Sequence, residues 1–219
     1  MIPRGYPQLP VRAKLGLAPL AAIVFAVYTL GHHGVIDFRL DAGQPPPHHH
    51  TATPPATRAA VPPAPSRPAL ADIPGNYLTL YRASGKACPG LVWNVLAGIG
   101  KVESDHGRSS APGVRWGVNG FGCCSGPMQF NIRNGPPSTW DRYGRGGNVY
   151  DPRDAIPAAA RLLCANGIGD RSPPSGDPCP GVLGTAGEHQ AVKAYNHACW
   201  YVGQVLTLAH AYQASGGGR

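Results

Sequence analysis

The chain has 219 residues, enough for one ordinary domain with accessory segments, and its 25 prolines and 30 glycines are unevenly distributed. Its net charge of +8 divides into +4 over residues 1–71 (six Lys/Arg, two Asp), +3 over residues 72–213 (twelve Lys/Arg, nine Asp/Glu), and Arg219. A region at +3 without a basic run lacks the electrostatic footprint of a nucleic-acid-binding domain, so we expect no nucleic-acid partner. A mild positive bias suits an anionic polymer instead.

The N-terminus has the pattern of an export signal. A basic segment at residues 1–14 precedes an uncharged run at residues 15–36, whose apolar body covers residues 15–30. That body is near the short limit of about 17–25 residues for a membrane span and exceeds the about 7–15 of a usual signal peptide. Because basic flanks stay cytoplasmic, residues 1–14 are predicted to be cytoplasmic and the bulk of the chain extracytoplasmic. An uncleaved signal anchor in the membrane is favoured over a cleaved signal peptide with a cleavage site at 29–31, which would release a secreted protein.

Residues 37–70 have the composition of a disordered linker. Pro, Ala and Thr dominate this stretch, which favours extended polyproline II over a packed core. The histidines at 48–50 could bind a metal ion loosely, but polar residues of a solvated linker are the favoured interpretation. No metal site and no cofactor is therefore expected. The folded domain is predicted at residues 71–213, with a flexible tail at 214–219.

Apolar spacing in this folded part predicts a mainly α domain. Helices are expected at residues 76–82, 91–104, 151–164, 188–195 and 201–212. In the clearest of them, residues 91–104, apolar residues recur at helical spacing, whereas Asn94, Lys101 and Asp105 fall on the other side. Asp151 is the expected N-cap of the third helix, with Pro152 at its first position.

The segments between these helices are rich in Gly, Ser and Pro, which predicts surface loops at residues 108–122, 134–148 and 169–184. Between the first two loops lies a short apolar island at residues 126–132. It is predicted to form one or two helical turns. No segment shows the alternation of a long strand.

All six cysteines follow the apolar N-terminal segment: Cys88, Cys123, Cys124, Cys164, Cys179 and Cys199. An even number of cysteines beyond an export signal predicts disulfides. A zinc site would need paired CxxC or CxxH spacing, which the chain lacks. The sequence alone leaves the pairing open.

Glu103 is one of only two glutamates in the chain. It follows Ile99 by four residues and Leu96 by seven, which places it on the apolar side of the helix predicted at 91–104. A carboxyl group among apolar neighbours is desolvated, so its pKa rises, as a general acid requires near neutral pH. Periodicity alone still favours an ordinary helix-end glutamate over a catalytic one.

Three segments together resemble the signature of the SLT-type lytic murein transglycosylases. The segments are Ala97-Gly98-Ile99-Gly100-Lys101-Val102-Glu103-Ser104-Asp105-His106-Gly107, Gly126-Pro127-Met128-Gln129-Phe130 and Ala194-Tyr195-Asn196-His197. Residues 151–156 also resemble the segment that such enzymes carry between the second and third parts. The resemblance covers about residues 73–212 and implies a goose-lysozyme-like, mostly helical fold.

The resemblance assigns the catalytic role to the first segment. Glu103 would be the sole catalytic acid, and Ser104 would hydrogen-bond near the substrate or to Glu103. In the second segment, Gly126 would let the backbone come close, while Met128 and Gln129 would line the glycan groove.

The resemblance gives supporting roles to the rest of the signature. Tyr195 would orient Glu103, and Asn196 would hold the adjacent turn. Phe130 is as consistent with a core residue as with a substrate subsite.

The resemblance also bears on the cysteines. It makes Cys88 and Cys164 the favoured pair. Cys123-Cys124 and Cys199 depart from the family pattern and could place disulfides beside the groove.

Ordinary glycosidases use two carboxylates, but no second catalytic motif is recognisable here. Asp105, Asp141, Asp151 and Asp154 lie in the region of the signature, and none of them belongs to such a motif. A single-acid reaction therefore fits better: cleavage of the bond between N-acetylmuramic acid and N-acetylglucosamine in peptidoglycan, giving 1,6-anhydromuramic acid ends. The expected partner is the glycan strand, bound by a monomer. The alternatives are a hydrolytic muramidase on the same fold and a non-catalytic peptidoglycan-binding module.

Overall fold

The computed structural model of the protein describes residues 62–173 and 175–214. The predicted cytoplasmic N-terminus (1–14), the signal segment (15–36), the linker as far as residue 61 and the tail from residue 215 lie outside these ranges. Among the residues that are described, no helix is both long enough and apolar enough to cross a bilayer.

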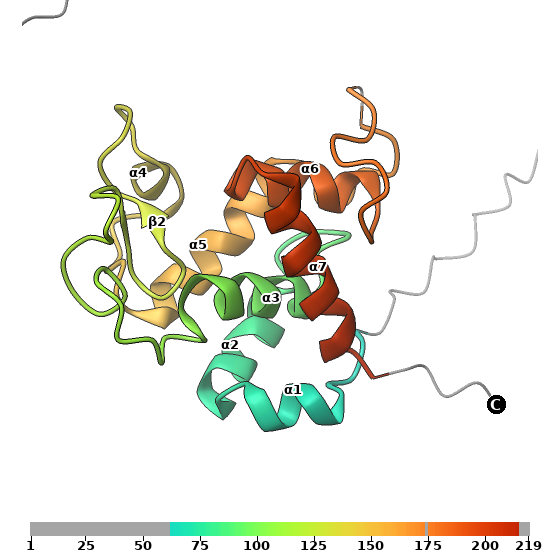
Figure 1. Ribbon diagram of the computed structural model, residues 1–219, viewed down its shortest axis with the longest axis horizontal. Coiled ribbons are helices and arrows are strands. Elements are labelled where there is room, and N and C mark those ends of the chain that lie inside the picture. The colour runs from blue at the N-terminus through green and yellow to red at the C-terminus, as the bar shows by residue number, and fades with distance from the viewer. Residues whose placement is uncertain (1–61, 174, 215–219) are drawn as a thin grey trace, which may run out of the picture. The chain divides into compact units, whose positions relative to one another are not determined.

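The described residues form seven helices and one small antiparallel hairpin (Figure 1). In chain order the elements are α1 (Arg67–Asp72), α2 (Gly75–Ser84), α3 (Trp93–Ser104), β1 (Cys124–Ser125), β2 (Phe130–Asn131), α4 (Thr139–Tyr143), α5 (Pro152–Ala165), α6 (Ala186–Tyr195) and α7 (Cys199–Tyr212). The mainly α prediction is confirmed. Both strands of this region are only two residues long, as the lack of alternation indicated.

Helix α3 lies at the centre of the domain, and α7 crosses it (Figure 1). Nine of its twelve residues are buried. Gly98 allows the two helices to approach closely, because a β-carbon there would stand 2.5 Å from the carbonyl oxygen of Val205. The Asn94 side chain is buried and donates to the carbonyl of Ala209 in α7 at 2.8 Å. The prediction that Asn94 lies on the polar side of this helix is therefore wrong.

Helices α5 and α6 both begin at side-chain caps. The Asp151 carboxylate accepts a hydrogen bond from the backbone N–H of Arg153 at 2.8 Å, and Pro152 occupies the first position of α5, as predicted. Helix α6 begins with a capping box made by Thr185 and Glu188. Glu188, the second glutamate of the chain, thus has a structural partner in its own helix.

The folded domain begins earlier than the predicted boundary at residue 71. Helix α1 begins inside the segment that was expected to be linker, and Ala69 within it is fully buried. Ser66 caps this helix by accepting from the N–H of Ala69, and its own N–H donates to the carbonyl of Tyr212. The proline-rich composition concealed a serine N-cap followed by a short helix.

The apolar island at residues 126–132 is a hairpin rather than the predicted helical turns. Cys124 pairs with Asn131 and Ser125 pairs with Phe130. Gly126 at the start of the connecting turn has φ +80°, a left-handed conformation that ends any helix and suits glycine.

The segment at residues 134–148, predicted to be a loop, contains helix α4. Ser138 and Asp141 form a capping box at its start. The surrounding glycines and prolines hid this local signal.

Disulfides are confirmed, with pairs Cys88–Cys164, Cys123–Cys124 and Cys179–Cys199. The favoured Cys88–Cys164 pair is therefore confirmed as well. It joins the segment before α3 to the end of α5. Cys179–Cys199 joins the loop before α6 to the first residue of α7.

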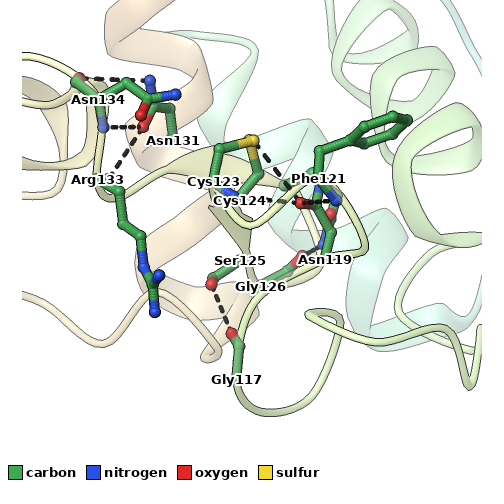
Figure 2. The surroundings of a disulfide bond; sticks show 11 residues. Gly117, Asn119, Phe121, Cys123, Cys124, Ser125, Gly126, Asn131, Arg133 and Asn134 are labelled. Carbon is green, nitrogen blue, oxygen red and sulfur yellow. Dashed lines mark hydrogen bonds between the residues drawn. A yellow bond between two sulfur atoms is a disulfide. The ribbon is translucent and has the colours of Figure 1, made fainter. Parts of the chain in front are cut away.

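The Cys123–Cys124 disulfide links neighbours in the chain and closes a tight turn (Figure 2). The Asn119 side-chain oxygen accepts hydrogen bonds from the N–H groups of Phe121 and Cys123 inside this turn. The Phe121 side chain points away from it and is 92% exposed. The turn leads directly into β1 and so fixes the start of the hairpin.

Candidate active site

Glu103 is the last residue but one of α3. The helix ends at Ser104 because Asp105 and His106 both adopt left-handed conformations, with φ of 53° and 55°. Glu103 therefore lies where the central helix gives way to the loop that leads to the hairpin. The periodicity correctly indicated that it faces away from Lys101 and Asp105, which form an ion pair with each other.

The Glu103 carboxyl group is desolvated and has a single side-chain partner. Burial raises its pKa to about 7, and the hydrogen bond from the Tyr201 hydroxyl acts in the opposite direction. That hydroxyl donates to Oε1 of Glu103 at 2.6 Å. The carboxyl is therefore divided between its acid and base forms near neutral pH, as a group that both donates and accepts a proton requires.

Ser104 connects the end of α3 to the hairpin turn. Its hydroxyl donates to the carbonyl of Pro127 at 2.6 Å and accepts from the N–H of Gly107 at 2.8 Å. The residue is buried. Ser104 thus holds two signature segments together, and its hydroxyl bonds to Pro127 and Gly107 rather than to Glu103. A hydrogen bond near the substrate stays a prediction.

The hairpin turn packs against its own domain. A β-carbon on Gly126 would collide with the carbonyl of Val149, so this glycine permits a close backbone approach within the protein. The Met128 side chain is fully buried, which corrects the prediction that it lines an open groove. Gln129 is only partly buried, and its side-chain amide donates to the carbonyl of Gly126 at 2.8 Å.

Tyr195 binds the hairpin turn instead of the catalytic candidate. Its hydroxyl donates to the carbonyl of Met128 at 2.6 Å. The predicted role of orienting Glu103 belongs to Tyr201, six residues later. Phe130 is 2% exposed and lies edge-on to both Trp140 and Tyr195, so it is a core residue and not a subsite.

Asn196 ends helix α6. Its N–H donates to the carbonyl of Val192, and its own carbonyl accepts from the N–H of Ala198 at 2.8 Å. These backbone bonds hold the corner between α6 and α7, in agreement with the expected role in a turn. Three signature segments therefore converge: the end of α3, the hairpin turn and the α6–α7 corner.

Tyr201 is the site residue that sequence reasoning missed. It belongs to the buried stripe of α7, four residues before Val205, and is 1% exposed. A buried tyrosine needs a hydrogen-bond partner for its hydroxyl, and this requirement could have indicated that Tyr201 binds a polar group in the interior. The burial of this phenol and the nearby Glu103 charge raise its own pKa well above the usual value, so it remains a donor.

A second polar cluster lies just beyond Glu103. His106 is buried, with Nδ1 at 3.0 Å from the hydroxyl of Tyr81 and Nε2 at 3.4 Å from that of Tyr212. Burial lowers the pKa of His106 to about 4, so the imidazole is neutral at pH 7. Asp72 completes the cluster through hydrogen bonds from Tyr212 and Lys101. This network fixes the turn that follows α3.

Asp105, Asp141, Asp151 and Asp154 are each engaged by their own local structure. Asp105 forms ion pairs with Lys101 and Arg108. Asp141 accepts from the N–H of Ser138, Asp151 from the N–H of Arg153, and Asp154 from the N–H of Asn148. Asp105 is held most firmly, because hydrogen bonds from Arg108 and Lys101 lower its pKa to about 2. None of these contacts involves Glu103.

Across residues 62–173 and 175–214, no three His, Cys, Asp or Glu side chains are grouped so as to hold a metal ion. Comparisons of the chain with protein-family models, curated proteins and solved structures give no match.

Proposed function

We propose that this protein is a lytic transglycosylase with a goose-lysozyme-like domain that cleaves the glycan strands of peptidoglycan. The observation that carries the proposal is the Glu103 carboxyl, whose pKa is raised to about 7 and whose Oε1 accepts from Tyr201. It stands where the three segments that resemble the family signature converge. The N-terminal segment at residues 15–36 would place the enzyme outside the cytoplasm, either anchored in the membrane or secreted.

In the first step, protonated Glu103 donates its proton to the oxygen that links N-acetylmuramic acid to N-acetylglucosamine. The bond between that oxygen and C1 of the muramic acid breaks, and the N-acetylglucosamine end leaves as an alcohol. The substrate's own N-acetyl group stabilises the positive charge that develops at C1. Tyr201 donates to the carboxylate that Glu103 has become, which favours this first proton transfer.

In the second step, the Glu103 carboxylate takes the proton from the 6-hydroxyl of the same muramic acid. The hydroxyl oxygen attacks C1 and closes the 1,6-anhydro ring. Glu103 is protonated again, and no water is consumed. A pKa near 7 suits both steps, because neither form of the carboxyl is strongly disfavoured.

The engagement of the aspartates supports a mechanism with one carboxyl. A second catalytic carboxylate would have to act as nucleophile or base close to the scissile bond. Asp105, the nearest in sequence, is held in ion pairs with Lys101 and Arg108. Glu103, by contrast, has a raised pKa and a phenolic partner, Tyr201.

Zymography in gels containing purified peptidoglycan tests the proposal. The Glu103→Gln variant of the full chain should lose its clearing band, whereas Glu188→Gln should keep it. Glu188→Gln is a matched control, because it makes the same chemical change at the only other glutamate and glutamine also serves in a capping box. Clearing by Glu103→Gln at the level of the unmodified protein would refute the catalytic assignment.

A further inference from the structure

Trp200 is an exposed tryptophan next in sequence to Tyr201, the tyrosine that binds the proposed catalytic carboxyl. It is the second residue of α7, and 69% of its surface is exposed. An isolated exposed apolar residue is common and needs no functional explanation. Trp200 differs in its position, because the residues before and after it in the chain are both held in place.

The residue before Trp200 is held covalently. Cys199 forms a disulfide with Cys179, which is itself buried. The residue after it, Tyr201, is buried and donates its hydroxyl to Glu103 at 2.6 Å. The backbone at Trp200 therefore has little freedom relative to the catalytic carboxyl.

The indole ring is also tied to the site. Its centroid is 6.1 Å from that of the Tyr201 ring, with an edge-on angle of 81°. Such aromatic pairs are attractive at this separation. Two contacts, indole to phenol and phenol to carboxylate, thus connect Trp200 to Glu103, while most of the indole remains open to solvent.

We infer that Trp200 is a sugar-binding platform on which a pyranose ring of the glycan strand stacks while a neighbouring linkage lies at Glu103. This inference rests on the proposed function and extends it to a named binding residue. A pyranose ring has a face of C–H groups, and an indole offers a flat apolar face with negative charge density that complements them. A polymeric substrate extends beyond the bond that is cleaved, so its neighbouring sugars must rest on the surface around the carboxyl.

A sugar-binding platform away from the scissile bond increases the rate of cleavage by positioning the substrate. Binding energy from parts of the substrate that do not react holds the reacting bond against the catalytic group. Trp200 is suited to this role because its own position is set before the substrate arrives. It is a binding residue and takes no part in proton transfer.

The test uses the full chain with Glu103→Gln, which binds without cleaving, and glycan strands freed of their peptide stems. Adding Trp200→Ala should weaken binding about twofold to tenfold, the range expected for losing one aromatic contact. Trp200→Tyr should restore most of the binding, because it keeps an aromatic face. The matched control is Trp116→Ala, which removes another exposed tryptophan (78% exposed); among the described residues, it is Trp200 whose indole pairs with the Tyr201 ring.

Each outcome decides a different proposal. If the unmodified chain cleaves peptidoglycan but Trp200→Ala leaves binding unchanged, or if Trp116→Ala weakens it as much, the platform is refuted and the proposed function stands. If the unmodified chain does not cleave peptidoglycan and the Glu103→Gln chain does not bind the strands, both proposals fail. Unchanged thermal unfolding of Trp200→Ala should accompany the predicted loss of binding.

Discussion

Replacing Tyr201 by phenylalanine tests how the structure sets the acidity of Glu103. The change removes the hydroxyl that donates to Oε1 at 2.6 Å and keeps the buried ring. This hydrogen bond stabilises the ionised carboxylate more than the protonated acid, so it holds the pKa below the value that burial alone would give. Without the bond, the pKa of Glu103 should rise above about 7.

The size of the rise follows from the energy of the bond. A hydrogen bond to a charged group contributes about 1.5–3 kcal/mol, and one pKa unit corresponds to about 1.4 kcal/mol. The Tyr201→Phe variant should therefore show a Glu103 pKa about one to two units higher. Its acid form should persist to higher pH, and the alkaline limb of the pH–activity profile should move by the same amount.

Carbon-13 NMR titration of the glutamate carboxyls measures this directly. The chain has only two glutamates, so the spectrum contains two titrating signals, and Glu103→Gln identifies which belongs to the site. Glu188, which caps α6, provides the internal reference signal. A Glu103 pKa that stays constant or falls in the variant would show that Tyr201 does not control this carboxyl.

Three further predictions concern the frame around the site. Gly126→Ala should destabilise the fold by about 2 kcal/mol or more in urea unfolding, because a β-carbon there collides with the carbonyl of Val149. The control Gly146→Ala has a similar φ of +74° but open space around the β-carbon, so it should cost only about 1 kcal/mol. Equal losses in the two variants would contradict the collision. Replacing Cys88 and Cys164 together by serine should lower the free energy of unfolding by about 2–4 kcal/mol, because the disulfide spans 76 residues, and an unchanged urea midpoint would disprove this. Burial alone would raise the pKa of Asp72, but hydrogen bonds from its partners lower it far below the usual 3.8. The stabilisation by the Asp72 carboxylate should therefore be complete above about pH 5 and be lost as the pH falls below about 4. The difference in unfolding free energy between the unmodified protein and Asp72→Asn should accordingly shrink in acid. A difference that does not change with pH would show that the Asp72 carboxylate is not its source.

The helices could be predicted where the chain carries its own local signals. The apolar spacing before Glu103 correctly placed its carboxyl in a desolvated position, and Asp151 followed by Pro152 marked the start of α5. Such signals depend on residues within one or two turns of each other. They failed for α1, where Ser66 caps a helix inside a proline-rich tract whose composition suggested a linker.

The partner of Glu103 could not be predicted, because it depends on how distant elements pack. Tyr195 and Tyr201 both lie near the α6–α7 corner, and spacing does not indicate which phenol reaches a carboxyl on α3. The crossing of α7 over α3 directs Tyr201 to Glu103 and leaves Tyr195 bonded to the carbonyl of Met128. The burial of the Met128 side chain also could not be predicted, because it depends on how the hairpin turn packs against the rest of the domain.

The central claim is that Glu103 alone converts peptidoglycan strands to anhydro products. Mass spectrometry of purified peptidoglycan digested by the full chain tests it most directly, with Glu103→Gln as the inactive reference. New 1,6-anhydromuramic acid ends are expected with no water added per cut, and none of them in the Glu103→Gln digest. Products heavier by one water per cut would contradict the claim and identify the protein as a hydrolytic muramidase.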